Sequence, residues 1–114
     1  MKRKLHKWFK ELLQKKYRYQ IASDVPNKIK KEIVYIIQND GYPWQIIMLC
    51  PCGCNKNLQM NLMKDYKPWW SFEVDKKNRI TLYPSIHRIV GCRSHFFIKK
   101  GKVIWASDYN RSFS

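Results

Sequence analysis

The stretch of sequence that constrains this fold most is Cys50-Pro51-Cys52-Gly53-Cys54, with a distant complement in Cys92-Arg93-Ser94-His95. These two segments hold all four cysteines of the 114-residue chain and one of its three histidines. Thiolate and imidazole groups are the preferred ligands of Zn²⁺, and structural zinc is bound tetrahedrally by four of them. The two segments therefore predict a zinc site that joins loops far apart in the sequence.

Five side chains in these segments compete for four positions around the metal. One ligand set is Cys52, Cys54, Cys92 and His95, which leaves Cys50 buried at a strand end. The other set is the four cysteines, which leaves His95 free for other chemistry. We favour the first set, but the spacing leaves both open. An iron–sulfur cluster is a less suitable occupant, because three cysteines at alternate positions are crowded for it. Since candidates outnumber positions, we expect a closed, structural site.

Reduced cysteines and a cytoplasmic location are also expected. The three cysteines of the first segment are too close together to bridge one another without strain, so at most one disulfide to Cys92 could form. The charged N-terminus is not followed by the unbroken apolar stretch of a signal peptide. The longest apolar runs, Ile33–Ile37 and Ile46–Cys50, are too short to cross a bilayer. We therefore predict a metal rather than disulfides, and no transmembrane segment.

The charge balance indicates an anionic partner. The chain carries 23 lysines and arginines against 8 acidic residues, a net charge of +15. Such a field attracts nucleic acid, an acidic protein or an anionic surface. Lysine outnumbers arginine here, and it is weaker evidence for a specific phosphate site than clustered arginine. A basic, zinc-containing module that binds nucleic acid is therefore one alternative for the function.

A basic amphipathic helix is predicted over residues 2–20. Apolar side chains recur there at steps of three and four residues, which places them on one helix face: Leu5, Trp8, Phe9, Leu12, Leu13 and Tyr17. Lysines and arginines fill the other faces. Pro26 ends the pattern, since proline stops a helix and extends the residue before it. We expect this helix to pack on the domain or to dock on a partner enzyme.

Beyond Pro26 the sequence changes to the short apolar and alternating runs that are typical of β-strands. Strands are predicted at 32–38, 44–50, 57–62, 69–74, 79–83, 96–98 and 103–105. The expected fold is α+β and mostly β: an N-terminal amphipathic helix followed by a small antiparallel sheet or sandwich pinned by the zinc site. The expected boundaries are 1–22 for the helix, 28–106 for the zinc-stabilised β-rich domain and 107–114 for a polar tail.

Ser85 and His95 are the main candidates for hydrolytic chemistry, and Ser94 and His87 complete the set. A serine nucleophile needs a base within hydrogen-bond reach, and the base needs an orienting group. Ser85 follows a proline at the end of a predicted strand, where its hydroxyl can be exposed. His95 can be the base only if the four cysteines bind the metal. Four acidic residues are candidates for the orienting group: Asp65, Glu73, Asp75 and Asp108.

A structural interpretation of the same residues competes with this one. Ser85 then caps a turn and His95 binds zinc. Cys50 is a further candidate nucleophile if the metal takes the other ligands, but it would need a lowered pKa. A metallopeptidase is disfavoured, because the chain has no His-Glu-x-x-His helix. Whether the protein is an enzyme, and then a peptidase, stays open from the residues alone.

Four segments taken together resemble a known family. They are Cys50-Pro-Cys-Gly-Cys54, Ile80-Thr-Leu-Tyr-Pro-Ser-Ile86, Gly91-Cys-Arg-Ser-His-Phe96 and Gly101-Lys-Val-Ile-Trp105, within residues 42–106. In this order they are similar to a family of small bacterial and phage proteins catalogued as domain of unknown function 6527. The resemblance implies a role beside a ubiquitin-like protein and its activating or conjugating enzymes, as an accessory or a processing, peptidase-like component.

Overall fold

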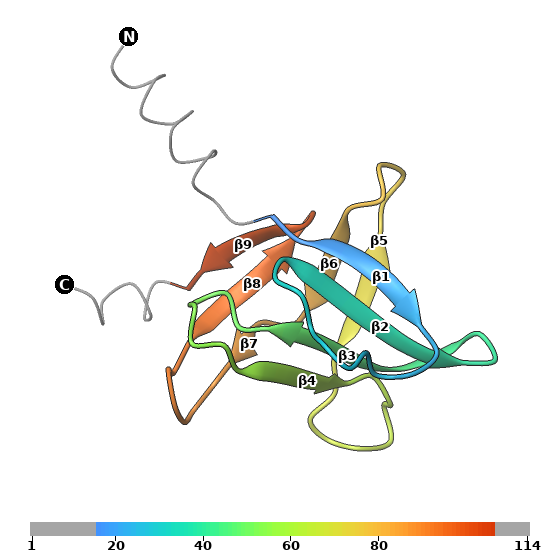
Figure 1. Ribbon diagram of the computed structural model, residues 1–114, viewed down its shortest axis with the longest axis horizontal. Coiled ribbons are helices and arrows are strands. Elements are labelled where there is room, and N and C mark those ends of the chain that lie inside the picture. Colours follow the sequence, from blue (N-terminus) through green and yellow to red (C-terminus); the bar gives the residue numbers. More distant parts are fainter. Residues whose placement is uncertain (1–15, 107–114) are drawn as a thin grey trace, which may run out of the picture.

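The computed structural model describes residues 16–106 (Figure 1). Nine strands in three sheets make up this part of the chain. The strands are β1 (Arg18–Ala22), β2 (Ile33–Asn39), β3 (Tyr42–Leu49), β4 (Asn57–Asn61), β5 (Ser71–Val74), β6 (Ile80–Tyr83), β7 (Ile86–His87), β8 (His95–Lys99) and β9 (Lys102–Trp105). Among the described residues there is no helix long and apolar enough to cross a membrane.

The first layer of the fold is a four-stranded sheet in the order β1-β2-β3-β4. β1 runs parallel to β2, and the other neighbours are antiparallel. Asp40 and Gly41 join β2 to β3, and their φ angles of 50° and 81° both lie in the left-handed region. A two-residue hairpin turn whose twist matches the sheet requires such angles, and Asp-Gly is a favoured pair for it. The loop between β3 and β4 carries three of the cysteines.

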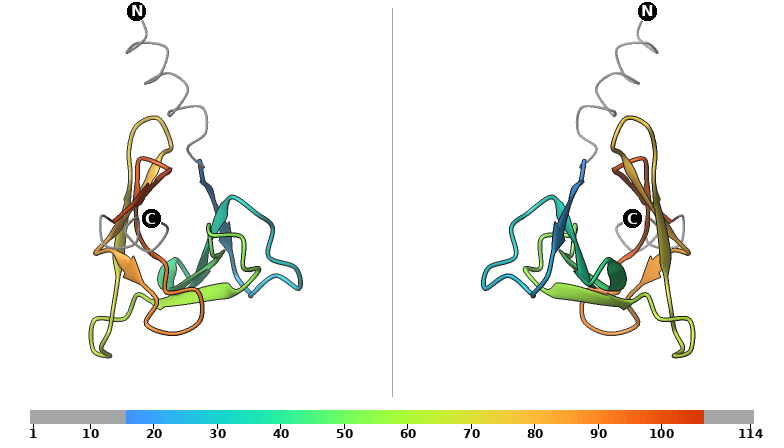
Figure 2. Two further views of the ribbon diagram at one scale, coloured as in Figure 1. Left: turned by 90° about the vertical axis from the view of Figure 1, so that its left-hand side faces the viewer. Right: turned by 90° about the vertical axis from the view of Figure 1, so that its right-hand side faces the viewer.

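The second layer consists of the β5-β6 hairpin and the sheet β7-β8-β9. Figure 2 shows this layer facing the four-stranded sheet, and the main core cluster draws on both layers. The core side chains include Ile36, Met48, Ile80, Phe96 and Ile98, each at most 1% exposed. Burying an apolar side chain of this size stabilises a fold by about 1.5–3 kcal/mol. The alternate residues on the strands of the second layer point away from this core.

Tyr17 links the two layers. Its N–H donates to the carbonyl of Gly101 in the β8–β9 turn, and its hydroxyl donates to the Leu49 carbonyl at 3.0 Å. Gly101 in turn donates to the Ile80 carbonyl at 2.7 Å. A Cβ at position 101 would lie 2.8 Å from the Tyr17 carbonyl oxygen, and φ there is +78°, so only glycine fits this crossing.

The predicted α+β fold with an N-terminal helix is wrong. The described residues form strands only, and the end of the predicted helix is strand β1, which is parallel to its neighbour. Tyr17 and Tyr19 lie two residues apart, so the apolar pattern there fits a strand as well as a helix. Pairing with β2 satisfies the backbone of Arg18–Ala22 and makes this segment a strand. The rest of the predicted helix, 1–15, and the predicted tail, 107–114, lie outside the described residues.

The strands predicted after Pro26 are confirmed, with small shifts at their ends. Each of them has an apolar or alternating run that a sheet can bury on one face. β1 and β7 were not predicted as strands. β7 has only two residues, which is too short for any alternation to be visible in the sequence.

Candidate metal centre and serine–histidine pair

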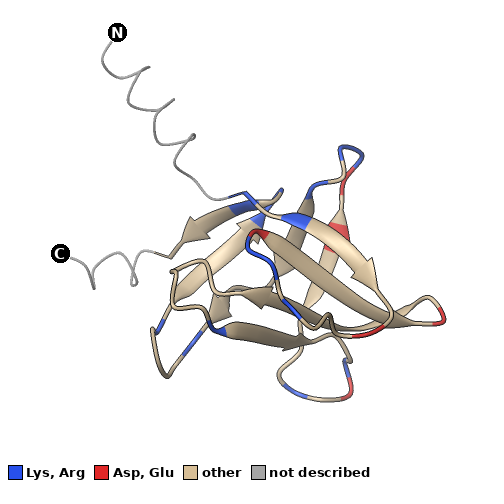
Figure 3. Cartoon of the chain, in the orientation of Figure 1, with Lys and Arg blue, Asp and Glu red and all other residues tan. Residues whose placement is uncertain are grey.

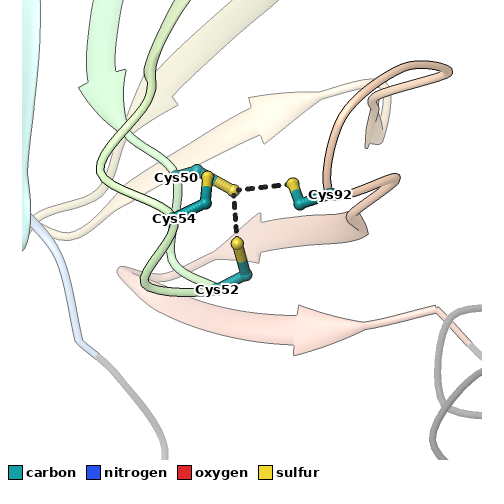
Figure 4. Close-up of side chains that lie close together, drawn as sticks. All are labelled: Cys50, Cys52, Cys54 and Cys92. Atoms are coloured by element: carbon teal, nitrogen blue, oxygen red, sulfur yellow. Dashed lines mark hydrogen bonds between the residues drawn. The ribbon is translucent and has the colours of Figure 1, made fainter.

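Four cysteine side chains converge between two loops (Figure 4). Cys50, Cys52 and Cys54 come from the segment between β3 and β4, and Cys92 comes from the segment between β7 and β8. Their sulfur atoms all lie within 4.8 Å of one another, and all four are free of disulfides. Cys50 Sγ lies 3.4 Å from Cys52 Sγ and 3.6 Å from Cys92 Sγ.

The spacing of these sulfurs fits a tetrahedral metal ion. Thiolate sulfurs bound about 2.3 Å from Zn²⁺ lie about 3.8 Å from one another at tetrahedral angles. The separations found here are close to that value, whereas a disulfide would bring two sulfurs to about 2.05 Å. The four cysteines could therefore hold a metal through thiolates alone. His95 is not part of this group.

Two backbone hydrogen bonds close the loops that carry the sulfurs. In the first loop the Cys50 N–H donates to the Lys56 carbonyl at 2.9 Å. Gly53 within that loop has φ of +93°, a conformation that glycine adopts without strain. In the second loop the Arg88 N–H donates to the Ser94 carbonyl at 2.8 Å. Each loop therefore returns on itself and presents its thiols to the other.

Arg88 and Ser94 surround the thiols with hydrogen-bond donors. The Arg88 guanidinium donates to Cys92 Sγ at 3.2 Å and to Cys54 Sγ at 3.5 Å. The buried Ser94 hydroxyl lies 2.9 Å from Cys92 Sγ and 3.3 Å from Cys50 Sγ. Donors and a positive charge beside thiolates favour the ionised form that binds metal.

The pKa values of two thiols move in opposite directions in this environment. Burial raises the pKa of Cys50 to about 12. Burial opposes ionisation at Cys92 as well, but hydrogen bonds with the Ser94 side chain and backbone outweigh it and lower the pKa of Cys92 to about 6. A cysteine nucleophile needs a lowered pKa and an accessible sulfur, whereas Cys50 is buried within the sulfur cluster.

Replacing Arg88 by glutamine is expected to weaken metal binding about 10–100-fold, because the change removes a charge and a donor fork beside the thiolates. A competition titration against a chromophoric chelator measures the effect. Arg93→Gln is the matched control, since Arg93 lies on the same loop but is exposed. Equal losses in the two variants would contradict a specific role for Arg88.

A second arrangement lies on the side of the β7-β8-β9 sheet that points away from the core. Ser85 Oγ lies 3.0 Å from His95 Nε2, within hydrogen-bond range. Ser85 directly precedes β7, where His87 pairs with His95 of β8. The two histidine rings stack with their centroids 4.2 Å apart and their planes 12° apart. On the other side of Ser85, the indole Nε1 of Trp70 donates to its carbonyl at 3.2 Å.

Strand alternation explains why His95 faces away from the thiols. Ser94 and Phe96 are fully buried and point toward the core, so His95 between them points to the opposite side. There its ring meets Ser85 rather than the sulfur cluster. Of the two ligand sets derived from the sequence, the structure brings together the four cysteines.

The acidic residues considered as orienting groups are placed as follows. Glu73 accepts a hydrogen bond from a tyrosine hydroxyl of β6, and Asp75 accepts one from an arginine of its own hairpin. Asp65 is exposed in the segment between β4 and β5, and Asp108 lies outside the described residues. The other predicted candidate, Ser94, lies among the sulfurs and not at the serine–histidine pair.

Three of these contacts were not predicted: those of Arg88 and Ser94 with the sulfurs, and that of Trp70 with Ser85. For Ser94 a signal was available, because it alternates with the apolar residues of the following strand and so points to the same side. Arg88 and Trp70 lie outside the regular strands. Their contacts depend on the path of the chain between strands, which local sequence does not determine.

Comparison with known proteins adds one finding. The model of a family described as "Bacterial ubiquitination-like system serine protease (BubE)" matches residues 21–106 of the 114-residue chain. No curated protein and no solved structure matches the chain. The expected link to bacterial ubiquitin-like systems is thereby confirmed, while the family number given above stays a prediction. The match spans the cysteine cluster and the serine–histidine pair, and the chain belongs to the BubE family.

Proposed function

We propose that this protein is a serine peptidase of a bacterial ubiquitin-like conjugation system, with Ser85 as the nucleophile and His95 as the general base. The observation that carries the proposal is the 3.0 Å separation of Ser85 Oγ and His95 Nε2. That contact occurs in a chain whose family is described as serine proteases. The substrate is a ubiquitin-like protein, either as a precursor with a C-terminal extension or as a conjugate.

The chemistry follows from this contact. The Ser85 hydroxyl donates to His95 Nε2, and Nε2 takes the proton as Oγ attacks the scissile carbonyl. His95 then gives the proton to the departing amine, the bond to that amine breaks, and Ser85 carries the acyl group as an ester. Water attacks the ester, with the same nitrogen as its base. The acid product leaves and the Ser85 hydroxyl is restored.

Two neighbouring aromatic residues hold the pair in this geometry. The His95 ring lies flat against His87, which limits its rotation. The Ala106 N–H donates to the His95 carbonyl at 2.9 Å, and the Trp70 indole holds the Ser85 carbonyl. Because the base is already oriented, less free energy is needed to reach the reactive arrangement.

The metal is proposed to be Zn²⁺ bound by Cys50, Cys52, Cys54 and Cys92, in a protein of the reducing cytoplasm. When bound, zinc supplies a structural cross-link between the two loops. The 88–94 loop leads directly into β8, whose first residue is His95. The cross-link therefore acts on the active pair through the position of this strand. All catalytic steps are carried by Ser85 and His95.

Product analysis tests the proposal. The full chain, loaded with zinc, is incubated with a bacterial ubiquitin-like protein that has a C-terminal extension, and intact masses are followed. We expect two products whose masses sum to the substrate plus one water. Substrates with the ubiquitin-like protein joined through an isopeptide or an ester bond are run in parallel. Recovery of all three substrates intact after long incubation would contradict the proposal.

A further inference from the structure

A groove of about 570 Å³ lies between the β5-β6 hairpin and the β8-β9 hairpin, on the same outward side as the serine–histidine pair. Its cationic lining side chains are Arg79, Lys99, Lys100 and Lys102. We call it the lysine groove. In Figure 3, basic segments gather where the turns of these two hairpins lie.

The lysine groove continues the surface that carries His95. On β8 the outward residues are His95, Phe97 and Lys99, since the residues between them are buried. The rings of His95 and Phe97 have centroids 6.0 Å apart, and Lys99 Nζ lies 5.3 Å from the Phe97 ring centroid. At about 3.3 Å per residue along a strand, His95 and Lys99 are about 13 Å apart. That distance is the length of about four residues of extended polypeptide.

The β6 side of the groove leads to Ser85 in the same way. Tyr83 lines the groove, and it lies two residues before Ser85 on the same chain segment. The groove lining also contains the apolar Ile104 of β9, which is 37% exposed and pairs with Phe97. The surface between the lysines and the reactive pair is therefore formed by aromatic and aliphatic side chains.

The charges in the lysine groove are unbalanced. The one acidic residue in the lining, Glu73, is engaged by the Tyr83 hydroxyl. Arg79 has Asp75 as its ion-pair partner, at 2.7 Å. Within residues 16–106 the lysines of the groove form no ion pair with an acidic side chain. Unpaired like charges close together repel one another, so an anionic ligand would relieve them.

We propose that the lysine groove binds an acidic, extended segment of the polypeptide substrate, about two to five residues from the bond cut at Ser85. This inference rests on the proposed function, and it adds a sequence preference to it. Lys99 and Lys102, which are paired across β8 and β9, are the residues that recognise the acidic side chains. Rim charges of this kind act mainly on the association rate and on specificity, and salt screens them.

Two pairs of fluorogenic peptides test the inference. In each pair, one peptide carries three glutamates and the other carries three glutamines at the same positions. These positions lie two to five residues before the scissile bond in the first pair and two to five residues after it in the second. For one of the two pairs, kcat/KM is expected to be about 10-fold higher for the glutamate peptide at low salt. The preference should shrink to about 2-fold or less at high salt. Equal rates for glutamate and glutamine in both pairs would overturn the inference but leave the proposed function intact.

Charge-reversed variants sharpen the test. Lys99→Glu/Lys102→Glu is expected to reverse the preference and to favour lysine peptides. Lys28→Glu/Lys30→Glu makes the same charge change on the exposed connection between β1 and β2, and it should keep the glutamate preference. Equal behaviour of the two double variants would assign the effect to net charge and overturn the inference.

A binding measurement covers the case in which no peptide is cleaved. The anisotropy of a labelled glutamate peptide is followed with the wild-type chain and with both double variants. Binding that only Lys99→Glu/Lys102→Glu abolishes supports the groove even if the proposed peptidase activity fails. A labelled single-stranded oligonucleotide is the competitor. The oligonucleotide could bind the groove more tightly than the glutamate peptide does and not be displaced by that peptide. This result would assign the groove to nucleic acid and overturn the inference.

Discussion

Replacing Ser85 by alanine is expected to reduce kcat about 10⁴–10⁶-fold while leaving the fold and the metal content unchanged. Removing the nucleophile of a serine–histidine pair abolishes the covalent route and leaves only the contribution of binding and polarisation. Ser85 is only half-buried, so loss of its hydroxyl should change the free energy of unfolding by about 0.5 kcal/mol or less. Single-turnover cleavage of the ubiquitin-like substrate measures the rate.

Ser71→Ala is the matched control for this change. Ser71 is exposed on β5, in register with Tyr83 of β6. Its loss should leave the rate within about 2-fold of wild type. The double change Ser85→Ala/His95→Ala should cost little more than either single change, because the two residues act as one unit. Residual cleavage within about 10-fold of wild type in Ser85→Ala would remove Ser85 from the mechanism.

Removing the metal is expected to unfold the region around His95 and to abolish cleavage. Binding free energy at a structural zinc site is also folding free energy. A loss of about 3 kcal/mol corresponds to a fall in Tm of roughly 12–24 °C for a domain of up to 100 residues. Differential scanning fluorimetry with and without a strong chelator measures this shift. Cys92→Ser should give the same result, because it removes the one sulfur contributed by the second loop.

Metal replacement controls for damage by the chelator. Adding Zn²⁺ to the chelated wild-type chain should restore both Tm and cleavage, whereas Mg²⁺, which prefers oxygen ligands, should restore neither. The Cys92→Ser variant should recover poorly in either case. An unchanged Tm in metal-free protein would show that the four thiols do not organise this fold.

Strands with a local apolar or alternating pattern could be predicted from the sequence, whereas a strand that depends on a tertiary contact could not. The runs at 33–37 and 46–50 are apolar over their whole length, and 57–62 alternates, so burial in a sheet was visible in the sequence. β1 was not visible. Its residues lie at the end of the stretch predicted as a helix, and only pairing with β2, a tertiary contact, makes them a strand.

The candidate site, too, could be predicted only as far as local sequence determines it. Cysteine spacing predicted that two loops meet at a metal, because every cysteine lies in those loops. It did not decide between Cys50 and His95 as the fourth ligand. That choice depends on which side of β8 the His95 ring points to, and this follows from the burial of Phe96 next to it. The contact of Ser85 with His95 further depends on the register of β7 on β8.

Labelling with a serine-reactive fluorophosphonate, mapped by tandem mass spectrometry, tests most directly whether Ser85 is a nucleophile activated by His95. For the zinc-loaded wild-type chain we predict one phosphonyl group, attached to Ser85 Oγ. The His95→Ala variant should label at least about 100-fold more slowly, since the base that takes the Ser85 proton is gone. Labelling at a different serine, or an unchanged rate on Ser85 in His95→Ala, would contradict the account.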